Sequence, residues 1–189
     1  MLRFMIIPAV LIAVLGCNQT ASAGTAMQVS GYAFSPPAFK SFCKREPRLC
    51  NTTNGKNVVE LTPARLAELK SVNVSVNRRI KERSDIQTSG KADYWELPAN
   101  QGDCEDFAIL KKSELLKRGW PASALLLTVA RFGGAGHTVL TVRTSKGDKV
   151  LDNRTGVIRD WSNTPYRYFA RQSQSAGQKW ERIGQARPN

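Results

Sequence analysis

Three residues of types that perform nucleophilic thiol chemistry lie at the ends of expected elements in this sequence. Cys104 follows a glycine turn, His137 is the only histidine, and Asp152 ends a later apolar run. In such a set the imidazole accepts the thiol proton and later protonates the leaving group, while the carboxylate fixes the imidazole tautomer. The pattern predicts Cys104 as nucleophile, His137 as base and Asp152 as orienting acid, with Asp160 as the alternative acid.

The stretch that begins at Cys104 predicts a helix. Leu, Lys, Glu and Ala dominate residues 104–118, and Gly119 with Pro121 just beyond ends the helix. A cysteine in the first turn lies at the positive end of the helix dipole, and this position favours the thiolate. The backbone N–H of Cys104 is a candidate oxyanion donor. The alternative interpretation is a buried structural cysteine, a common environment for free cysteines.

The first 23 residues are typical of a targeting segment. One positive charge precedes an apolar stretch at 4–16 that is too short to span a bilayer comfortably, and Ala21-Ser22-Ala23 fits a small-x-small cleavage site. We expect cleavage after Ala23, which leaves residues 24–189 as one periplasmic or secreted domain. A lipobox ending in Cys17, which would leave a lipid on that residue, is the alternative.

The four cysteines favour a reactive role for Cys104. Cleavage after Ala23 removes Cys17, and Cys43 and Cys50 are natural disulfide partners in an oxidising compartment. Cys104 is then the unpaired thiol, which an exported protein rarely keeps without a use because it invites mispairing. A zinc site is not favoured, because C-x6-C with one distant histidine matches no zinc spacing. Thiol chemistry itself requires no cofactor.

The composition and net charge indicate which classes of binding partner to expect. The chain has 189 residues, 41% hydrophobic and 23% charged, with a formal net charge of +13. These values indicate a globular domain with an anionic partner, such as an envelope surface or an acidic substrate. The basic residues form no long run and no patch interleaved with aromatic residues, so nucleic acid is not expected as a partner.

A second helix with one core face is predicted earlier in the chain. Thr62 as N-cap and Pro63 at the first helical position open it. Asn73 and Asn77 lie one turn apart beside its apolar stripe, and we interpret them as buried amides that hold a neighbouring loop. The predicted core face comprises Leu66, Leu69, Val72, Val76 and Ile80.

The segments on either side of the 104–118 helix complete the predicted fold. Three strand-like runs follow it, and together they predict an antiparallel meander and hence an α+β class. These runs are 124–131, 137–143 and 149–153. Residues 161–180 are a candidate further strand, and residues 84–101 are expected to be irregular. Trp95, in that irregular stretch, is either a loop anchor or a wall of the cleft, and the sequence leaves both open.

These motifs resemble those of the bacterial transglutaminase-like cysteine proteinases, a periplasmic group with a papain-like core. The matching segments are Tyr94-Trp95, Gly102 to Ala108, Gly136 to Val142 and Val150 to Asn153. The resemblance covers nearly the whole mature chain and implies a nucleophile at a helix N-terminus packed on an antiparallel sheet. It gives the same roles to Cys104, His137 and Asp152.

The resemblance also implies a substrate class and a metal. The best-known members release large surface adhesins by cutting near their N-terminal anchor, and some need calcium. The resemblance would place calcium on Asp103 and Glu105, the carboxylates that flank the nucleophile, although the ion takes about six to eight oxygen ligands. The alternative is that Asp103 caps the helix while Glu105 and Asp106 complement its dipole.

Three functions of different classes follow. The first is an exported cysteine peptidase that hydrolyses a peptide bond in an envelope or surface protein through a thioester. The second is a transglutaminase-type acyl transferase, in which an amine resolves the same thioester. The third is a non-catalytic envelope binding module on the same fold.

Overall fold

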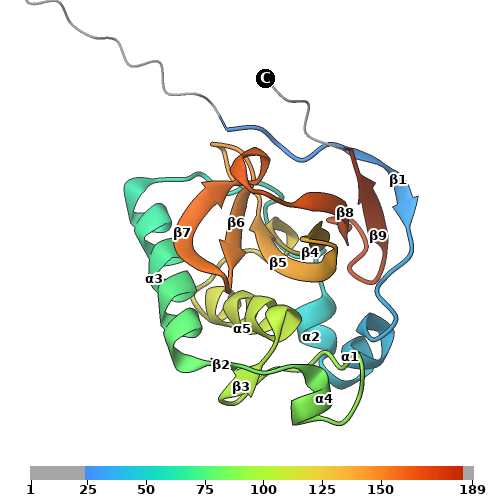
Figure 1. Cartoon of the computed structure of the whole chain (residues 1–189). Coiled ribbons are helices and arrows are strands. Elements are labelled where there is room, and N and C mark those ends of the chain that lie inside the picture. Colours follow the sequence, from blue (N-terminus) through green and yellow to red (C-terminus); the bar gives the residue numbers. More distant parts are fainter. Residues whose placement is uncertain (1–23, 185–189) are drawn as a thin grey trace, which may run out of the picture.

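The described part of the chain has the predicted α+β architecture. The computed structural model describes residues 24–184, so the expected targeting segment, with Ala23 and Cys17, lies outside the described residues. A seven-stranded antiparallel sheet lies above helix α5, and helix α3 runs beside its β7 edge (Figure 1). Its strands, in spatial order, are β1 (Val29–Ala33), β9 (Trp180–Ile183), β8 (Arg167–Gln172), β4 (Leu125–Phe132), β5 (Ala135–Val142), β6 (Lys149–Asp152) and β7 (Thr155–Asp160). The domain boundaries at 24 and 189 remain a prediction.

Five α-helices and a small strand pair complete the described elements. They are α1 (Phe39–Arg45), α2 (Pro47–Cys50), α3 (Pro63–Arg79), α4 (Asp85–Thr88) and α5 (Cys104–Lys117), with the parallel pair β2 (Lys81–Glu82) and β3 (Gln101–Gly102). Short 3-10 turns occupy Ala122–Ala124 and Trp161–Asn163. Within residues 24–184, none of the helices combines the length and hydrophobicity that a bilayer crossing requires.

The predicted meander forms strands β4, β5 and β6, each within two residues of its predicted bounds, and β7 extends it. Gly133 and Gly134 make the β4–β5 turn with φ of 57° and 86°, the left-handed pair that a two-residue hairpin turn requires. In the resulting register Ala130 pairs with His137, close to the turn. The sheet therefore presents His137 near the end of a strand.

Helix α3 begins as predicted, with the Thr62 Oγ1 atom accepting a hydrogen bond from the Arg65 N–H at 3.2 Å. Its buried apolar residues Leu69, Val72 and Val76 pack in the main core with α5. Leu66, predicted on this face, is 42% exposed. It lies in the first turn, and the buried face of α3 begins one turn later.

An aromatic cluster joins the N-terminal helices to the sheet. Phe39 and Phe42 from α1 and Trp180 from β9 lie around Trp95, with ring centroids 5.1 to 6.4 Å apart. Trp95 is 2% exposed, and its Nε1 donates to Asp93 Oδ1 at 3.0 Å. Trp95 is therefore a loop anchor and not a wall of a cleft. The predicted Cys43–Cys50 disulfide is present and links α1 to α2.

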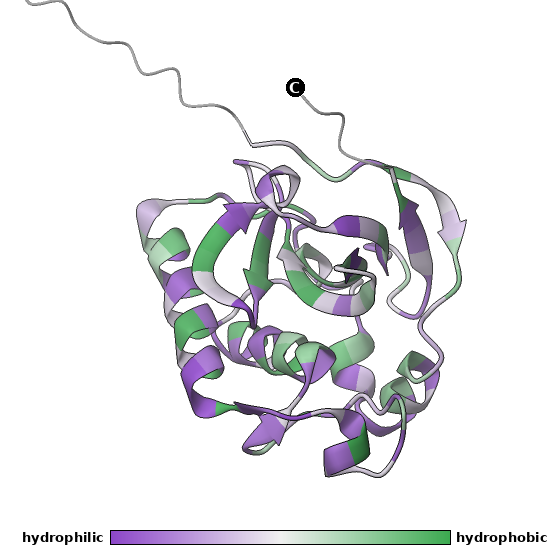
Figure 2. Cartoon of the chain, in the orientation of Figure 1, coloured by the Kyte–Doolittle hydropathy of each residue, from purple (hydrophilic) through white to green (hydrophobic). Residues whose placement is uncertain are grey.

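Hydrophilic residues are concentrated in the segment between α3 and α5. In Figure 2 the β2–β3 pair and most of the segment around α4, below α5, are coloured hydrophilic. The sequence predicted this stretch, residues 84–101, as irregular, and α4 is the short helix that it missed. The stretch 84–101 passes the N-terminus of α5, so it brings its carboxylates close to that end of the helix (Figure 1).

Candidate active site

Helix α5 places Cys104 at its first position, immediately after the Gly102-Asp103 turn. A Cβ atom on Gly102 would lie 2.5 Å from Asp106 Oδ2, so only glycine lets the backbone pass this close to the first turn of the helix. Cys104 is the free cysteine of the described chain and is partly exposed. The Thr138 N–H donates to its Sγ atom at 3.3 Å. Because Thr138 follows His137 on β5, the thiol lies beside the strand that carries the histidine.

His137 and Asp152 form a buried hydrogen-bonded pair on adjoining strands. The His137 Nε2 atom lies 2.9 Å from Asp152 Oδ1, and the two side chains are 7% and 3% exposed. This contact leaves Nδ1 as the imidazole nitrogen available to a substrate or thiol. Within residues 24–184, Cys104 hydrogen-bonds to Thr138 and Glu105 and not to His137. The contact of Cys104 with Thr138 and the contact of His137 with Asp152 nevertheless place the three predicted residues close together.

Tyr166 completes this cluster, and the sequence analysis assigned it no role. Its hydroxyl donates to Asp152 Oδ2, and its ring centroid lies 4.9 Å from that of His137. The pKa of Asp152 lies below its usual value: burial raises it, but hydrogen bonds from His137 and Tyr166 outweigh burial. No local motif marks Tyr166, because it approaches Asp152 only through the packing of β8 and its preceding loop.

The two asparagines of α3 hold the turn that carries Asp152. Asn73 Oδ1 accepts from the Asp152 N–H at 3.1 Å, and Asn73 Nδ2 donates to the Thr155 carbonyl at 2.8 Å. Asn77 Nδ2 donates to the Asp152 carbonyl at 2.8 Å. The prediction that these amides hold a neighbouring loop is confirmed. Asp160, the alternative acid, lies elsewhere: it pairs with Lys149 at 3.2 Å and caps the turn at Ser162.

The surroundings of Cys104 disfavour its thiolate form. Burial, followed by the neighbouring Glu105 carboxylate, raises its pKa well above the usual value. The thiol donates to Glu105 Oε2 at 3.1 Å. This direction is opposite to the one predicted from the helix dipole, because burial and a carboxylate one residue away raise the pKa of the thiol.

An acidic cluster surrounds the N-terminus of α5. The predicted pair, Asp103 and Glu105, is joined by Asp85 of α4, Asp93 of the following loop and Asp106 of α5. One oxygen each from Asp85, Asp103 and Asp106 lies within 4.8 Å of the others, and the same limit holds for Asp85, Asp93 and Glu105. The sequence analysis missed Asp85 and Asp93, because a contact across the 84–101 loop has no local periodicity.

Several oxygens of this cluster find no partner among residues 24–184. Asp85 Oδ1, Asp103 Oδ1 and Asp106 Oδ2 are buried there without a hydrogen bond. Burial raises the pKa of Glu105 to about 9 and that of Asp106 to about 8, and like charge in the cluster adds to both. Asp103 makes no side-chain capping bond to α5, so the capping alternative does not account for it. Buried, unpaired carboxylate oxygens in this number fit a hard cation such as calcium.

A free cysteine at a helix N-terminus, beside a His–Asp pair on an antiparallel sheet, defines the class of thiol hydrolases with a transglutaminase-like fold. The comparisons with known proteins agree with this class. The family model described as bacterial transglutaminase-like cysteine proteinase matches residues 29–188. The chain belongs to that family and is a cysteine peptidase.

The chain is also similar to solved structures of Legionella pneumophila LapG. The calcium-bound form is 22% identical over 82% of this chain and 84% of that chain, with a TM-score of 0.54. The EGTA-treated form is 24% identical over 73% of this chain and 75% of that chain, with a TM-score of 0.50. At this level of identity the likeness shows the fold alone. No curated protein matches the sequence.

Proposed function

We propose that the protein cleaves a peptide bond in an exported protein substrate through Cys104, His137 and Asp152. The observation that carries this proposal is the 2.9 Å contact between His137 Nε2 and Asp152 Oδ1, on the strands beside the free thiol. Tyr166 and Arg154 also donate to the Asp152 carboxylate, the latter from its backbone N–H at 3.2 Å. These contacts fix the imidazole with one nitrogen free.

The reaction follows from the roles of these groups. His137 takes the Cys104 proton, and the sulfur attacks the scissile carbonyl carbon. The imidazolium returns that proton to the amine as the C–N bond breaks, which leaves a thioester on Cys104. Water then attacks the thioester with His137 again as base, and the carboxylic acid product leaves as the thiol is restored. Asp152 holds the imidazole tautomer and stabilises the imidazolium at both steps.

The proposal includes calcium binding by the acidic cluster. The unpaired oxygens of Asp85, Asp103 and Asp106 fit such a site, with Glu105 and Asp93 as further ligands. Calcium, when bound, supplies positive charge that neutralises these carboxylates. With the ion bound, Glu105 would serve as a ligand instead of accepting the Cys104 S–H hydrogen bond, and the thiol proton would be available to His137. In this way the cluster links ion binding to nucleophile activation.

The first test needs no substrate. Alkylation of Cys104 by iodoacetamide is followed against pH in the wild-type protein and in His137→Ala, with calcium and with EGTA. We expect calcium-dependent alkylation that persists well below the free-thiol pKa of about 8.5 and that is lost in His137→Ala. A rate that titrates like an ordinary thiol and ignores both His137 and calcium would contradict the proposal.

The second test identifies the reaction. A peptide library is incubated with the calcium-loaded protein and with its Cys104→Ala variant, and the products are sequenced by mass spectrometry. New N-termini that require Cys104 support a peptidase. Isopeptide products with a lysine-rich acceptor would indicate acyl transfer instead, and a reactive thiol without products would leave a binding module.

Export and location are part of the proposal. We place the mature protein, residues 24–189, in the periplasm or outside the cell, with an envelope or surface protein as its substrate. Support comes from the apolar N-terminal stretch with its Ala21-Ser22-Ala23 site and from the Cys43–Cys50 disulfide, which requires an oxidising compartment. N-terminal sequencing of the protein from its cells tests cleavage after Ala23, and a lipid on Cys17 would contradict it.

A further inference from the structure

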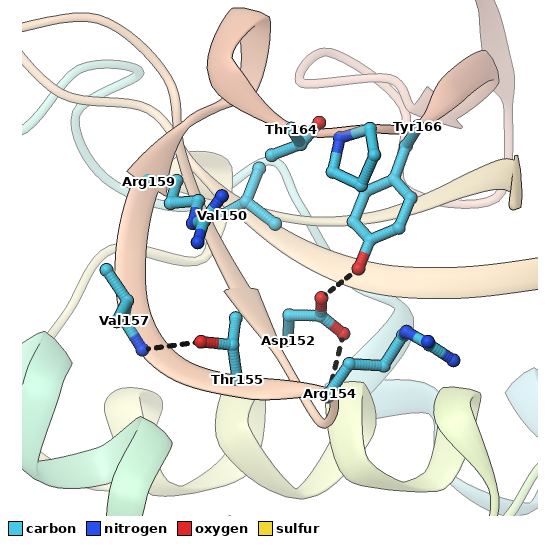
Figure 3. Close-up of a pocket in the computed structure, with 9 residues that line it drawn as sticks. Val150, Asp152, Arg154, Thr155, Val157, Arg159, Thr164 and Tyr166 are labelled. Carbon is cyan, nitrogen blue, oxygen red and sulfur yellow. Dashed lines mark hydrogen bonds between the residues drawn. The ribbon is translucent and has the colours of Figure 1, made fainter.

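A concave site with basic side chains adjoins the triad on the side of Asp152. It is a cavity of about 160 Å³ between β6, β7 and the loop that leads to β8, and Figure 3 shows its lining. Val150, Val157 and Pro165 supply apolar surface, and Arg154 and Arg159 supply charge. The volume is below the roughly 300–1,000 Å³ of sites for whole small molecules, so it suits a single side chain.

The two arginines of this cavity have no carboxylate partner. Both are exposed, and neither forms an ion pair within the part of the chain that the structure describes. The Arg154 guanidinium lies 4.3 Å from the Phe132 ring centroid, and Phe132 in turn packs on Tyr166 at 5.6 Å. Stacking therefore holds Arg154 at the rim without neutralising it.

The carboxylate that lines the cavity is already satisfied. Asp152 Oδ1 faces His137 Nε2 and accepts from the Arg154 N–H, and its Oδ2 accepts from Tyr166. Figure 3 shows Asp152 and Tyr166 between the two arginines, with Arg159 on one side and Arg154 on the other. Two guanidinium charges against one paired carboxylate leave the cavity net positive, and imidazolium formation at His137 adds to this.

The chemistry of the triad tells which part of a substrate reaches this cavity. His137 must deliver its proton to the leaving amine, so the segment after the scissile bond departs on the imidazole side. Asp152 and Tyr166 lie directly behind that imidazole and also line the cavity. An extended chain advances about 3.3 Å per residue, so the cavity meets the substrate within about four residues after the cut.

We propose that this cavity is a specificity subsite that binds an aspartate or glutamate side chain on the leaving-group side of the scissile bond. Arg154 and Arg159, on opposite sides of the cavity, supply the positive charge that attracts the carboxylate, while Val150, Val157 and Pro165 contact its methylene groups. The inference rests on the proposed peptidase activity and adds a substrate feature to it: an acidic residue shortly after the cleavage site.

The test compares cleavage sites between matched variants. A proteome-derived peptide library is digested by the calcium-loaded wild type, by Arg154→Gln/Arg159→Gln and by Arg118→Gln, whose exposed arginine ends α5 at the opposite end from Cys104. We expect Asp and Glu to be enriched within four positions after the cut in wild type and in Arg118→Gln. In the double variant this enrichment disappears while cleavage continues.

A matched peptide pair then gives the size of the effect. One peptide from the library is resynthesised with Glu or Gln at the enriched position. We expect kcat/KM about 5- to 20-fold higher for Glu, a ratio near 1 in the double variant, and a smaller ratio at about 0.5 M NaCl. The single variant Arg159→Gln keeps every contact to Asp152, and we expect its iodoacetamide reaction with Cys104 to stay at the wild-type rate; the same reaction in the double variant measures whether the triad is intact there.

The outcomes separate this inference from the function on which it rests. Cleavage without acidic enrichment, or with enrichment that survives loss of both arginines, overturns the subsite and leaves the peptidase standing. No Cys104-dependent cleavage of any peptide overturns the peptidase and the subsite with it.

Discussion

At the scale of single residues, Tyr166 supports the pair of His137 and Asp152 from two sides. Its hydroxyl donates to Asp152 and its ring packs on His137. Tyr166→Phe keeps the ring and removes the donor, so the pKa of Asp152 rises toward its usual value. If Asp152 must be ionised for reaction, the acid limb of the pH–rate profile for Cys104 alkylation moves up by about one pH unit, while the rate at pH 7, where Asp152 stays ionised, changes little.

Tyr168→Phe is the matched control for this prediction. It removes a hydroxyl that bonds to Thr164 from a ring of the same cluster. We expect its acid limb to stay at the wild-type position. An unchanged limb in Tyr166→Phe as well would mean that His137 alone sets the ionisation of Asp152.

At the scale of elements, α3 positions the β6–β7 turn that carries Asp152 from outside the sheet. Asn73 is fully buried and bonds to both sides of the β6–β7 turn, at the Asp152 N–H and the Thr155 carbonyl. Asn73→Ala leaves these backbone groups without those partners. We expect a loss of about 1–3 kcal/mol in the free energy of unfolding, measured by urea denaturation, together with slower alkylation of Cys104. Ser71→Ala, on the same helix and exposed, should change neither.

The elements also show which parts of the fold could be predicted from the sequence. The α5 helix, the meander and the α3 cap follow from local signals: a glycine stop, period-two alternation, and Thr-Pro at a helix start. Asp85 and Tyr166 do not, because their roles arise from packing between segments that are distant in sequence. The thiol environment of Cys104 was misjudged for the same reason, since burial and the carboxylate cluster are tertiary properties.

Helix α5 carries two adjacent buried lysines that make stability depend on pH. Burial lowers the pKa of both Lys111 and Lys112 to about 7, and Lys111 Nζ has no hydrogen-bond partner within residues 24–184. The unfolded chain keeps the usual pKa of about 10.4, so between pH 7 and 10 it binds more protons than the folded chain. Stability therefore rises with pH across this window.

Replacing one lysine should remove about half of this rise. We expect Lys111→Met to increase the free energy of unfolding at pH 7 by a few kcal/mol and to flatten its pH dependence, measured by urea denaturation from pH 6 to 10. Lys117→Met, at an exposed position of the same helix, is the control. An unchanged slope in Lys111→Met would mean that this amine remains charged in the folded protein.

At the scale of the whole molecule, the charge is divided between a basic surface and one acidic centre. The net charge is +13, yet five carboxylates lie close together at the N-terminus of α5. They come from α4, from the loop that follows it and from the start of α5 itself. Their mutual repulsion and burial disfavour the folded state when no cation is present. A cation that binds them adds to the links between α4, its following loop and α5, which the Tyr94 N–H to Asp85 and Glu96 N–H to Asp106 hydrogen bonds already make.

Calcium should therefore stabilise the entire fold and not only the active site. A ligand specific for the folded state adds about 2.7 kcal/mol at 100 times its Kd, so we expect the thermal midpoint to rise with calcium and to return with EGTA. Asp85→Asn/Asp103→Asn should melt at the same temperature with and without calcium, because it lacks two of the converging ligands. Glu60→Gln, at an exposed carboxylate outside the cluster, should respond like wild type. A calcium response that persists in the double variant would place the ion elsewhere, and the link between ion binding and Cys104 would then fail with it.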